Sequence, residues 1–79
     1  MVPKYFRIGE VIENSHFSRQ VIHNYTQLDL IQEAKRTPAG HRLYDESVFE
    51  RLERIKRLKA EGKTLLEIRR ILNGDSSHV

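Results

Sequence analysis

The stretch TPAGHRLYDES, residues 37–47, passes from turn-forming residues through a short apolar pair to the acidic start of a helix. Gly40 predicts a tight turn, because glycine accepts positive φ without steric cost. Leu43–Tyr44 is β-capable, and Asp45 is a good N-cap for the long helix that follows. The pair His41–Arg42 is therefore expected at or just past the tip of the turn, between a strand and a helix.

A second β-capable pair, Leu30–Ile31, precedes a polar segment that runs from Glu33 to His41. Pro38 and Gly40 in this segment favour a hairpin of two short strands. The segment has no carboxylate after Glu33. This is typical of a wing that lies along a phosphate backbone. An ordinary solvated loop would also explain the positive charge of the segment. The cationic or potentially cationic residues of this segment and of the position directly after it are Lys35, Arg36, His41 and Arg42.

Two short helices are predicted before this hairpin. Apolar residues at helical spacing predict the first over about residues 7–14. Ser18 is a good N-cap for a second helix over about residues 18–28. A helix pair with such a short connection is typical of a helix-turn-helix. The apolar stripe of the second helix consists of Val21, Ile22, Tyr25 and Leu28.

The face of the second helix opposite this stripe contains no carboxylate, and each of its side chains can form hydrogen bonds. A face that only confers solubility usually includes glutamate, so this one suits a partner rich in hydrogen-bond acceptors. The face consists of Arg19, Gln20, His23, Asn24 and Gln27.

Two further helices are predicted after the hairpin. The third begins after Asp45 and stops at Gly62, while Thr64–Glu67 matches a capping box for the fourth, which Gly74 ends. Basic residues of the third helix alternate with carboxylates, so we expect a solvated face with i,i+4 ion pairs, some of which could reach flanking phosphate. These basic residues are Arg51, Arg54, Lys56, Arg57 and Lys59.

Length and composition limit the chain to one small domain. It has 79 residues and no cysteine, which excludes disulfides and thiolate metal sites. No apolar run is long enough to cross a membrane, and the first residues lack the apolar core of a signal peptide, so we expect a cytoplasmic protein. The net charge of +3 is a weak indication of a nucleic-acid partner, because placement matters more than excess.

Motifs of catalysis and metal binding are absent from the sequence. There is no H-E-x-x-H, no glycine-rich phosphate loop and no G-x-S-x-G. The histidines at 16, 23 and 41 do not have the spacing of metal ligands. We therefore expect no enzyme activity, no metal and no cofactor.

Four segments, in the same order, resemble the MerR family of bacterial transcription regulators: FRIGEV at 6–11, FSRQVIHNY at 17–25, GHRLY at 40–44 and EGKTLLEI at 61–68. The resemblance implies a winged helix-turn-helix fold that is mostly α, with a small two-stranded β wing and the order α-α-β-β-α-α. It implies a DNA-binding domain over residues 1–74 and a flexible tail over 75–79.

The resemblance also implies sequence-specific binding of a double-stranded DNA operator. The second helix would enter the major groove, and the wing, about residues 32–44, would follow the phosphate backbone. Tyr25 and Tyr44 could also be core residues whose hydroxyls reach out. The base-reading residues would be Arg19, Gln20, His23 and Asn24. The phosphate contacts would be Ser18, Tyr25, Lys35, Arg36, His41, Arg42 and Tyr44.

The match to the family pattern is incomplete in the second helix, where Val21, Asn24 and Thr26 stand at positions that usually carry threonine, tyrosine and glutamate in the family. The family carries S-x-x-T-I-R-Y-Y in its second helix, and Ser18, Ile22 and Tyr25 fit this pattern. His23 stands where the family usually has arginine, and a neutral imidazole would make binding at that point depend on pH. The wing pattern is met in full at residues 40–44.

Family members usually dimerise through a long helix that follows this domain. The sequence is compatible with a domain excised from a longer regulator and with a small stand-alone protein. We expect the isolated chain to be a monomer that binds DNA in the micromolar range or more weakly. We expect the whole regulator to act as a homodimer or side-by-side oligomer, with RNA polymerase as a possible partner at the promoter. The alternative is a protein-interaction module whose basic face docks an acidic protein or inhibitor.

Overall fold

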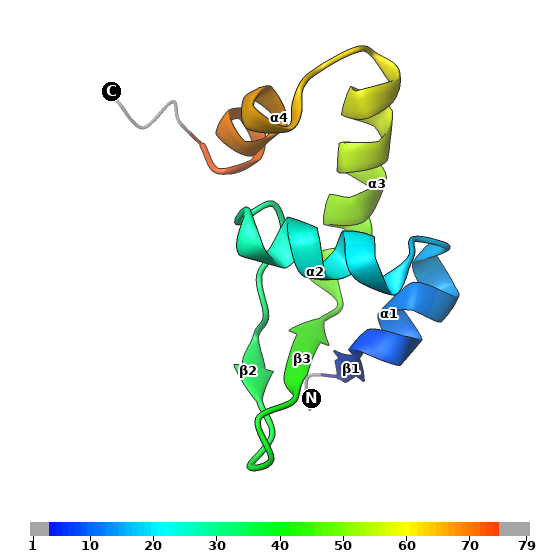
Figure 1. Ribbon diagram of the computed structural model, residues 1–79, viewed down its shortest axis with the longest axis vertical. Coiled ribbons are helices and arrows are strands. Elements are labelled where there is room, and N and C mark those ends of the chain that lie inside the picture. The colour runs from blue at the N-terminus through cyan, green and yellow to red at the C-terminus, as the bar shows by residue number, and fades with distance from the viewer. Residues whose placement is uncertain (1–3, 75–79) are drawn as a thin grey trace.

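The computed structural model describes residues 4–74, which form four helices and a three-stranded antiparallel sheet. The expected winged helix-turn-helix architecture, mostly α, is confirmed. In Figure 1, α2 lies across one end of the β2–β3 hairpin, and the tip of the hairpin projects away from the helices. The predicted tail at 75–79 lies outside the described residues. The elements are β1 (Tyr5–Arg7), α1 (Ile8–Ser15), α2 (Arg19–Gln27), β2 (Lys35–Arg36), β3 (Arg42–Asp45), α3 (Ser47–Ala60) and α4 (Leu65–Leu72).

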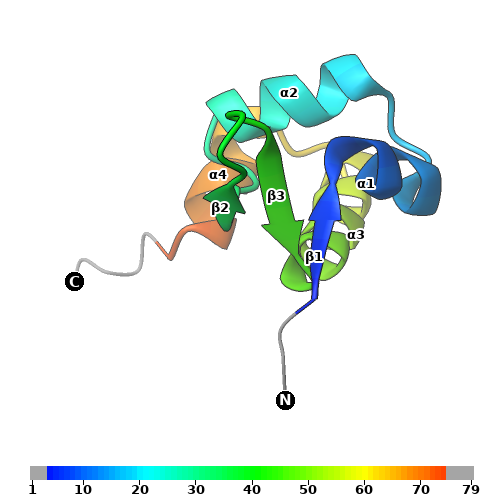
Figure 2. The same ribbon diagram turned by 90° about the horizontal axis from the view of Figure 1, so that it is seen from below.

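The sheet has one strand more than the two that the sequence indicated. β3 is the central strand and pairs with β1 on one side and β2 on the other (Figure 2). Phe6 of β1 lies opposite Tyr44 of β3. The Phe6 ring packs edge-on against the ring of Phe49 in α3, with 4.9 Å between the ring centroids. A strand of three residues is too short to show the alternation by which strands are recognised in a sequence.

The strand predicted at Leu30–Ile31 is wrong, and the first strand of the hairpin lies at Lys35–Arg36 instead. Asp29 adopts a left-handed conformation with φ of 62°, which reverses the chain after α2. The backbone N–H groups of Leu30 and Ile31 then both donate to the carbonyl of Tyr25 rather than to a neighbouring strand. The two side chains are fully buried, so their apolar character reflects the core and not a β ladder.

The helix boundaries agree closely with the sequence signals. The Ser18 hydroxyl accepts a hydrogen bond from the backbone N–H of Val21, as expected for the cap of α2. Gly62 has φ of 91° and ends α3, and the capping box between Thr64 and Glu67 is formed in both directions. The expected turn at Gly40 is also confirmed, with φ of 90°.

Asp45 is one residue too early to be the N-cap of α3, which corrects the prediction. The N-cap position is Glu46, and it has no side-chain capping bond. The Asp45 carboxylate instead accepts the backbone N–H of Ser47 at 2.9 Å, so it still satisfies a donor in the first turn of the helix.

One continuous core joins the sheet to all four helices. Leu28, expected in the buried stripe of α2, is 45% exposed because it occupies the C-cap, where the chain leaves the helix. No helix between residues 4 and 74 combines the length and apolar character needed to span a bilayer. The buried residues are Val11, Ile22, Tyr25, Leu30, Ile31, Tyr44, Val48, Leu52, Ile55, Ile68 and Leu72.

The ion pairs expected along α3 do not form between the described residues, whose salt bridges all lie elsewhere. Arg51 turns inward instead. Its Nε donates to the carbonyl of Leu30 at 2.6 Å and its Nη1 to the carbonyl of Leu72 at 3.2 Å, while Nη2 donates to the Asn73 side chain. Burial lowers the pKa of Arg51, and the nearby charge of Arg54 adds to this shift. One side chain thus joins α3 to the turn after α2 and to the end of α4.

Candidate nucleic-acid interface

A groove of about 720 Å³ lies between α1, α2 and the hairpin. Five of the predicted DNA-contact residues line it, although they come from segments far apart in the sequence. Glu10 and Glu13 of α1 line the same groove, so it is not purely cationic. The five predicted residues are Arg19, His23, Arg36, His41 and Arg42.

The outward face of α2 presents the predicted base-reading side chains. Arg19, Gln20 and Asn24 are exposed, and His23 is half-buried. The side-chain amide of Gln20 donates to the amide oxygen of Asn24 at 3.1 Å, so this bond holds the two side chains in a fixed relative orientation. The helix contains no acidic residue, so nothing on α2 itself repels an anionic partner.

A single carboxylate holds two of the wing arginines. Glu33 accepts from Nε of Arg36 at 2.7 Å and from Nε of Arg42 at 2.9 Å. The hydrogen bond from Arg36 lowers the pKa of Glu33, burial opposes this shift, and the charge of Arg36 and contacts with Arg42 reinforce it. The same bond raises the pKa of Arg36. The three groups together carry one net positive charge, less than the sequence alone suggests.

Arg42 also connects the wing to α2. Its Nη1 lies 2.9 Å from Nδ1 of His23, so strand β3 and helix α2 are joined by side chains as well as by core packing. The Arg42 side chain is 25% exposed, whereas that of Arg36 is 52% exposed. The two arginines face each other across the hairpin ladder, but only Arg42 is drawn toward the helix.

Sequence comparison identifies the family. The model of the MerR HTH family regulatory proteins matches residues 6–75. The chain belongs to the MerR family. Membership implies DNA binding in transcription regulation.

Curated relatives and solved structures agree with this assignment. The mercuric resistance operon regulatory protein of Bacillus cereus is 40% identical over 67 residues, which are 85% of this chain and 51% of that protein. The nodulation protein NolA of Bradyrhizobium diazoefficiens is 35% identical over 72 residues, 91% of this chain and 30% of NolA. The N-terminus of the Bacillus subtilis multidrug transporter activator superposes with a TM-score of 0.80 at 34% identity, over 85% of this chain and 63% of that one. The chain therefore spans about a third to a half of the length of these two curated relatives.

Two tyrosines of the MerR-like pattern are core residues. Tyr44 is fully buried, and its hydroxyl lies 2.8 Å from the hydroxyl of Thr26. Thr26 already donates its hydroxyl proton to the carbonyl of Ile22, so Tyr44 is the donor in this pair. Tyr44 therefore has no exposed hydroxyl with which to contact a phosphate. Tyr25 is 4% exposed, and its phosphate contact stays a prediction.

Lys35 lies apart from the other wing cations. Consecutive residues of a strand point to opposite faces, so Lys35 and Arg36 diverge. The Lys35 ammonium lies 4.5 Å from the centre of the Tyr5 ring, a cation–π contact on the β1 side of the sheet. The predicted phosphate contacts of the wing thus divide between two faces of the hairpin.

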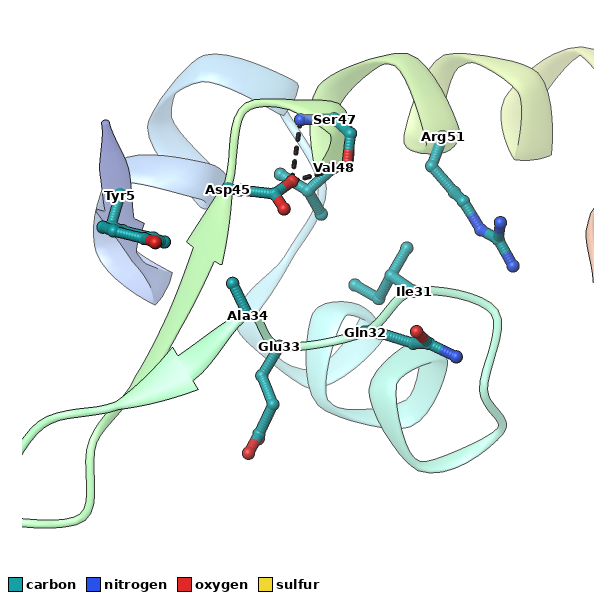
Figure 3. Close-up of a pocket in the computed structure, with 9 residues that line it drawn as sticks. All are labelled: Tyr5, Ile31, Gln32, Glu33, Ala34, Asp45, Ser47, Val48 and Arg51. Atoms are coloured by element: carbon teal, nitrogen blue, oxygen red, sulfur yellow. Dashed lines mark hydrogen bonds between the residues drawn. The ribbon is translucent and has the colours of Figure 1, made fainter. Parts of the chain in front are cut away.

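A second hollow, of about 600 Å³, lies between the hairpin and the start of α3. Figure 3 shows Asp45 bonded to Ser47 at one side of it, and Arg51 reaching from α3 at the other. No group of three or more histidine or acidic residues within residues 4–74 is arranged to hold a metal ion. No predicted DNA-contact residue lines this hollow, although Glu33, the partner of Arg36 and Arg42, borders it.

Glu33 and Thr26 hold predicted site residues in place, although nothing in the sequence assigned a role to either of them. Glu33 was visible only as the last acid before the cationic residues of the wing, and its partners stand three and nine residues away. Thr26 occupies a position where the family commonly has glutamate, and that departure was its only signal.

Proposed function

We propose that this domain binds double-stranded DNA sequence-specifically, with α2 in the major groove and the hairpin along the phosphate backbone. The observation that carries the proposal is the shared groove, in which the carboxylate-free face of α2 meets the cationic hairpin. A helix fits the major groove of B-DNA, and neighbouring cations neutralise the phosphates on its rim.

The base contacts belong to the exposed face of α2. Arg19 is suited to the two acceptors of guanine, O6 and N7, because its guanidinium presents paired donors. Gln20 and Asn24 are suited to adenine, which offers both an acceptor and a donor. Their mutual hydrogen bond fixes both amides, so we expect a change at either residue to alter selectivity at the same base step.

The phosphate contacts come from the start of α2 and from the hairpin. Ser18 lies at the N-terminus of α2, where backbone N–H groups favour an anion. Arg36 and His41 border the groove, and Lys35 serves the opposite face of the hairpin. Tyr25 would contribute only its hydroxyl, because its ring belongs to the core.

The experiment that tests the proposal is a titration of the ¹⁵N-labelled chain with a random-sequence duplex at low and at moderate salt. We expect amide shifts in residues 18–27 and 35–44 that fade as salt rises, because released counterions drive non-specific binding. Arg19→Ala should change the preferred sequence, whereas Arg70→Ala, which removes the same charge from exposed α4, should leave the preference unchanged. Absence of shifts at low salt would refute the proposal and favour an acidic protein partner on the same face.

The whole regulator is proposed to act in the cytoplasm as a dimer or side-by-side oligomer at a promoter, where it meets RNA polymerase. One domain reaches one half-site, so its affinity is low, and a second linked domain raises it through effective concentration. We expect the 79-residue chain to sediment as a monomer. A stable dimer at low micromolar concentration would contradict this expectation.

A further inference from the structure

The contact between Arg42 and His23 determines which nitrogen of the imidazole carries a proton. Arg42 has hydrogen-bond donors and no acceptor, and it stays charged in proteins. Its Nη1 lies 2.9 Å from Nδ1 of His23, so Nδ1 must accept this bond and is unprotonated. The single proton of the neutral ring therefore resides on Nε2.

Glu33 fixes Arg42 from the other side. Nε of Arg42 donates to Glu33 at 2.9 Å while Nη1 is engaged by His23, so the planar guanidinium is held at two points. Arg36 shares the same carboxylate but has no hydrogen bond to His23. The half-buried Arg42 head is thus directed at the helix and not outward to a phosphate.

The side chain of His23 forms part of the wall of the groove between α1, α2 and the hairpin. His23 lines it together with Arg19 and His41, and within residues 4–74 Nε2 has no hydrogen-bond partner. The ring stands among the predicted base-reading side chains of α2.

We propose that Arg42 is a positioning residue that holds His23 as the Nε2–H tautomer and presents this N–H to an acceptor on the major-groove edge, a purine N7. The proposal rests on the proposed DNA binding and specifies one of its contacts. A purine N7 accepts a hydrogen bond in the major groove, whereas the cytosine amino group only donates there. His23 then selects purine over cytosine at one position, and Arg42 acts on sequence preference through His23.

The first test uses the free protein. Ring ¹⁵N spectra of histidine-labelled chain, at a pH where imidazole is neutral, should give an unprotonated, hydrogen-bonded Nδ1 for His23. Arg42→Met keeps the aliphatic stem and removes the donor, so the Nδ1 signal should move toward that of exposed His16. Arg36→Met is the matched control, because it removes the other partner of Glu33 and should leave the signal in place.

Two results of this test would overturn the proposal. They are a proton on Nδ1 in the wild-type chain, and an unchanged ring spectrum in Arg42→Met. If the amide spectrum of Arg42→Met loses its dispersion, this variant is unfolded, and Arg42→Lys is used in its place. Lysine keeps the charge but has no planar fork to bridge Glu33 and His23, so the same movement of the signal is expected.

The second test is a double-mutant cycle on a duplex that the wild-type chain selects from a randomised pool. Arg42→Met should weaken binding to this duplex about three- to tenfold, the effect of one net hydrogen bond. In a His23→Ala background the same change should have almost no further effect. Replacing purines of the duplex by their 7-deaza analogues should reproduce the His23→Ala loss at one position only.

Additive losses in the cycle would overturn the proposal and make Arg42 an independent phosphate contact. In that case Arg42→Met would also reduce the slope of the logarithm of the DNA-binding constant against the logarithm of salt concentration by about one. Failure of the wild-type chain to bind any duplex would instead refute the proposed function and the role of His23 on DNA. The ring spectra would still decide whether Arg42 sets the tautomer.

Discussion

Replacing Arg51 by methionine tests how the C-terminal helix is held to the domain. The arginine donates to the carbonyl of Leu30, to that of Leu72 and to the Asn73 side chain. Methionine retains an apolar stem of similar length but no donor, so the packing of α3 is preserved while the three bonds are lost.

The size of the loss follows from where the acceptors lie. Leu30 is fully buried, and a hydrogen bond from a charged donor to a buried carbonyl contributes about 1.5–3 kcal/mol. Leu72 is 9% exposed and Asn73 is exposed, so water partly replaces these bonds and we assign them under about 1 kcal/mol together. We expect Arg51→Met to lower the free energy of unfolding by about 1.5–4 kcal/mol. A domain of 79 residues has about 4–12 kcal/mol in total, so this is a large share.

Urea unfolding followed by circular dichroism measures this loss. Arg54→Met is the matched control, because Arg54 is exposed on the same helix and has no hydrogen bond or ion pair to a residue within 4–74. We expect the control to change stability by less than about 0.5 kcal/mol. The reasoning is refuted if the two variants lose the same amount. A smaller m-value for Arg51→Met would show that α4 already separates in the native state.

Three further predictions concern the hairpin and the capping of α4. Tyr44→Phe, which removes the donor to Thr26, should lower the free energy of unfolding by about 1 kcal/mol in urea titrations, and an unchanged midpoint would contradict this. Gly40→Ala should lower the free energy of unfolding by about 1–2 kcal/mol in the same assay, because its φ of 90° strains alanine although no atom beyond the two neighbouring residues lies within 4 Å of the added Cβ. Hydrogen bonds from the backbone and side chain of Thr64 lower the pKa of Glu67 below its ordinary value of 4.5. The Glu67 carboxylate therefore stabilises the fold above pH 4.5, and this contribution is lost as the pH falls through the lowered pKa. Glu67→Gln should therefore lower the urea midpoint at neutral pH but not in strong acid, and an equal loss in both would refute the linkage.

Local signals in the sequence predicted most of the architecture. Ser18, Gly62 and Thr64 mark helix ends through bonds within four residues, so their roles are readable without a structure. The strand at Leu30–Ile31 was predicted wrongly because an apolar pair has the same appearance in a ladder and in a buried turn.

The parts that escaped prediction depend on contacts between distant segments. Arg51 reaches acceptors 21 and 22 positions away, and nothing in its neighbourhood distinguishes it from the exposed arginines of α3. The same holds for the interface, where Arg42 meets His23 across 19 positions and Glu33 across nine. A sequence shows which charges are present, but pairing across that separation requires the three-dimensional arrangement.

The position of β3 between two other strands limits where the chain tolerates changes in length. Strand β3 pairs with β2 through Arg42 and Leu43 and with β1 through residues 43–45, and only Glu46 separates it from α3. An insertion at Ala39 would lengthen the hairpin tip and leave this pairing intact. One residue inserted between Tyr44 and Asp45 would turn Asp45 to the opposite face of the sheet and displace the start of α3 by about 3.3 Å, the rise of one strand residue. The reach of the hairpin is therefore adjustable at its tip, while the connection from hairpin to helix has a fixed length.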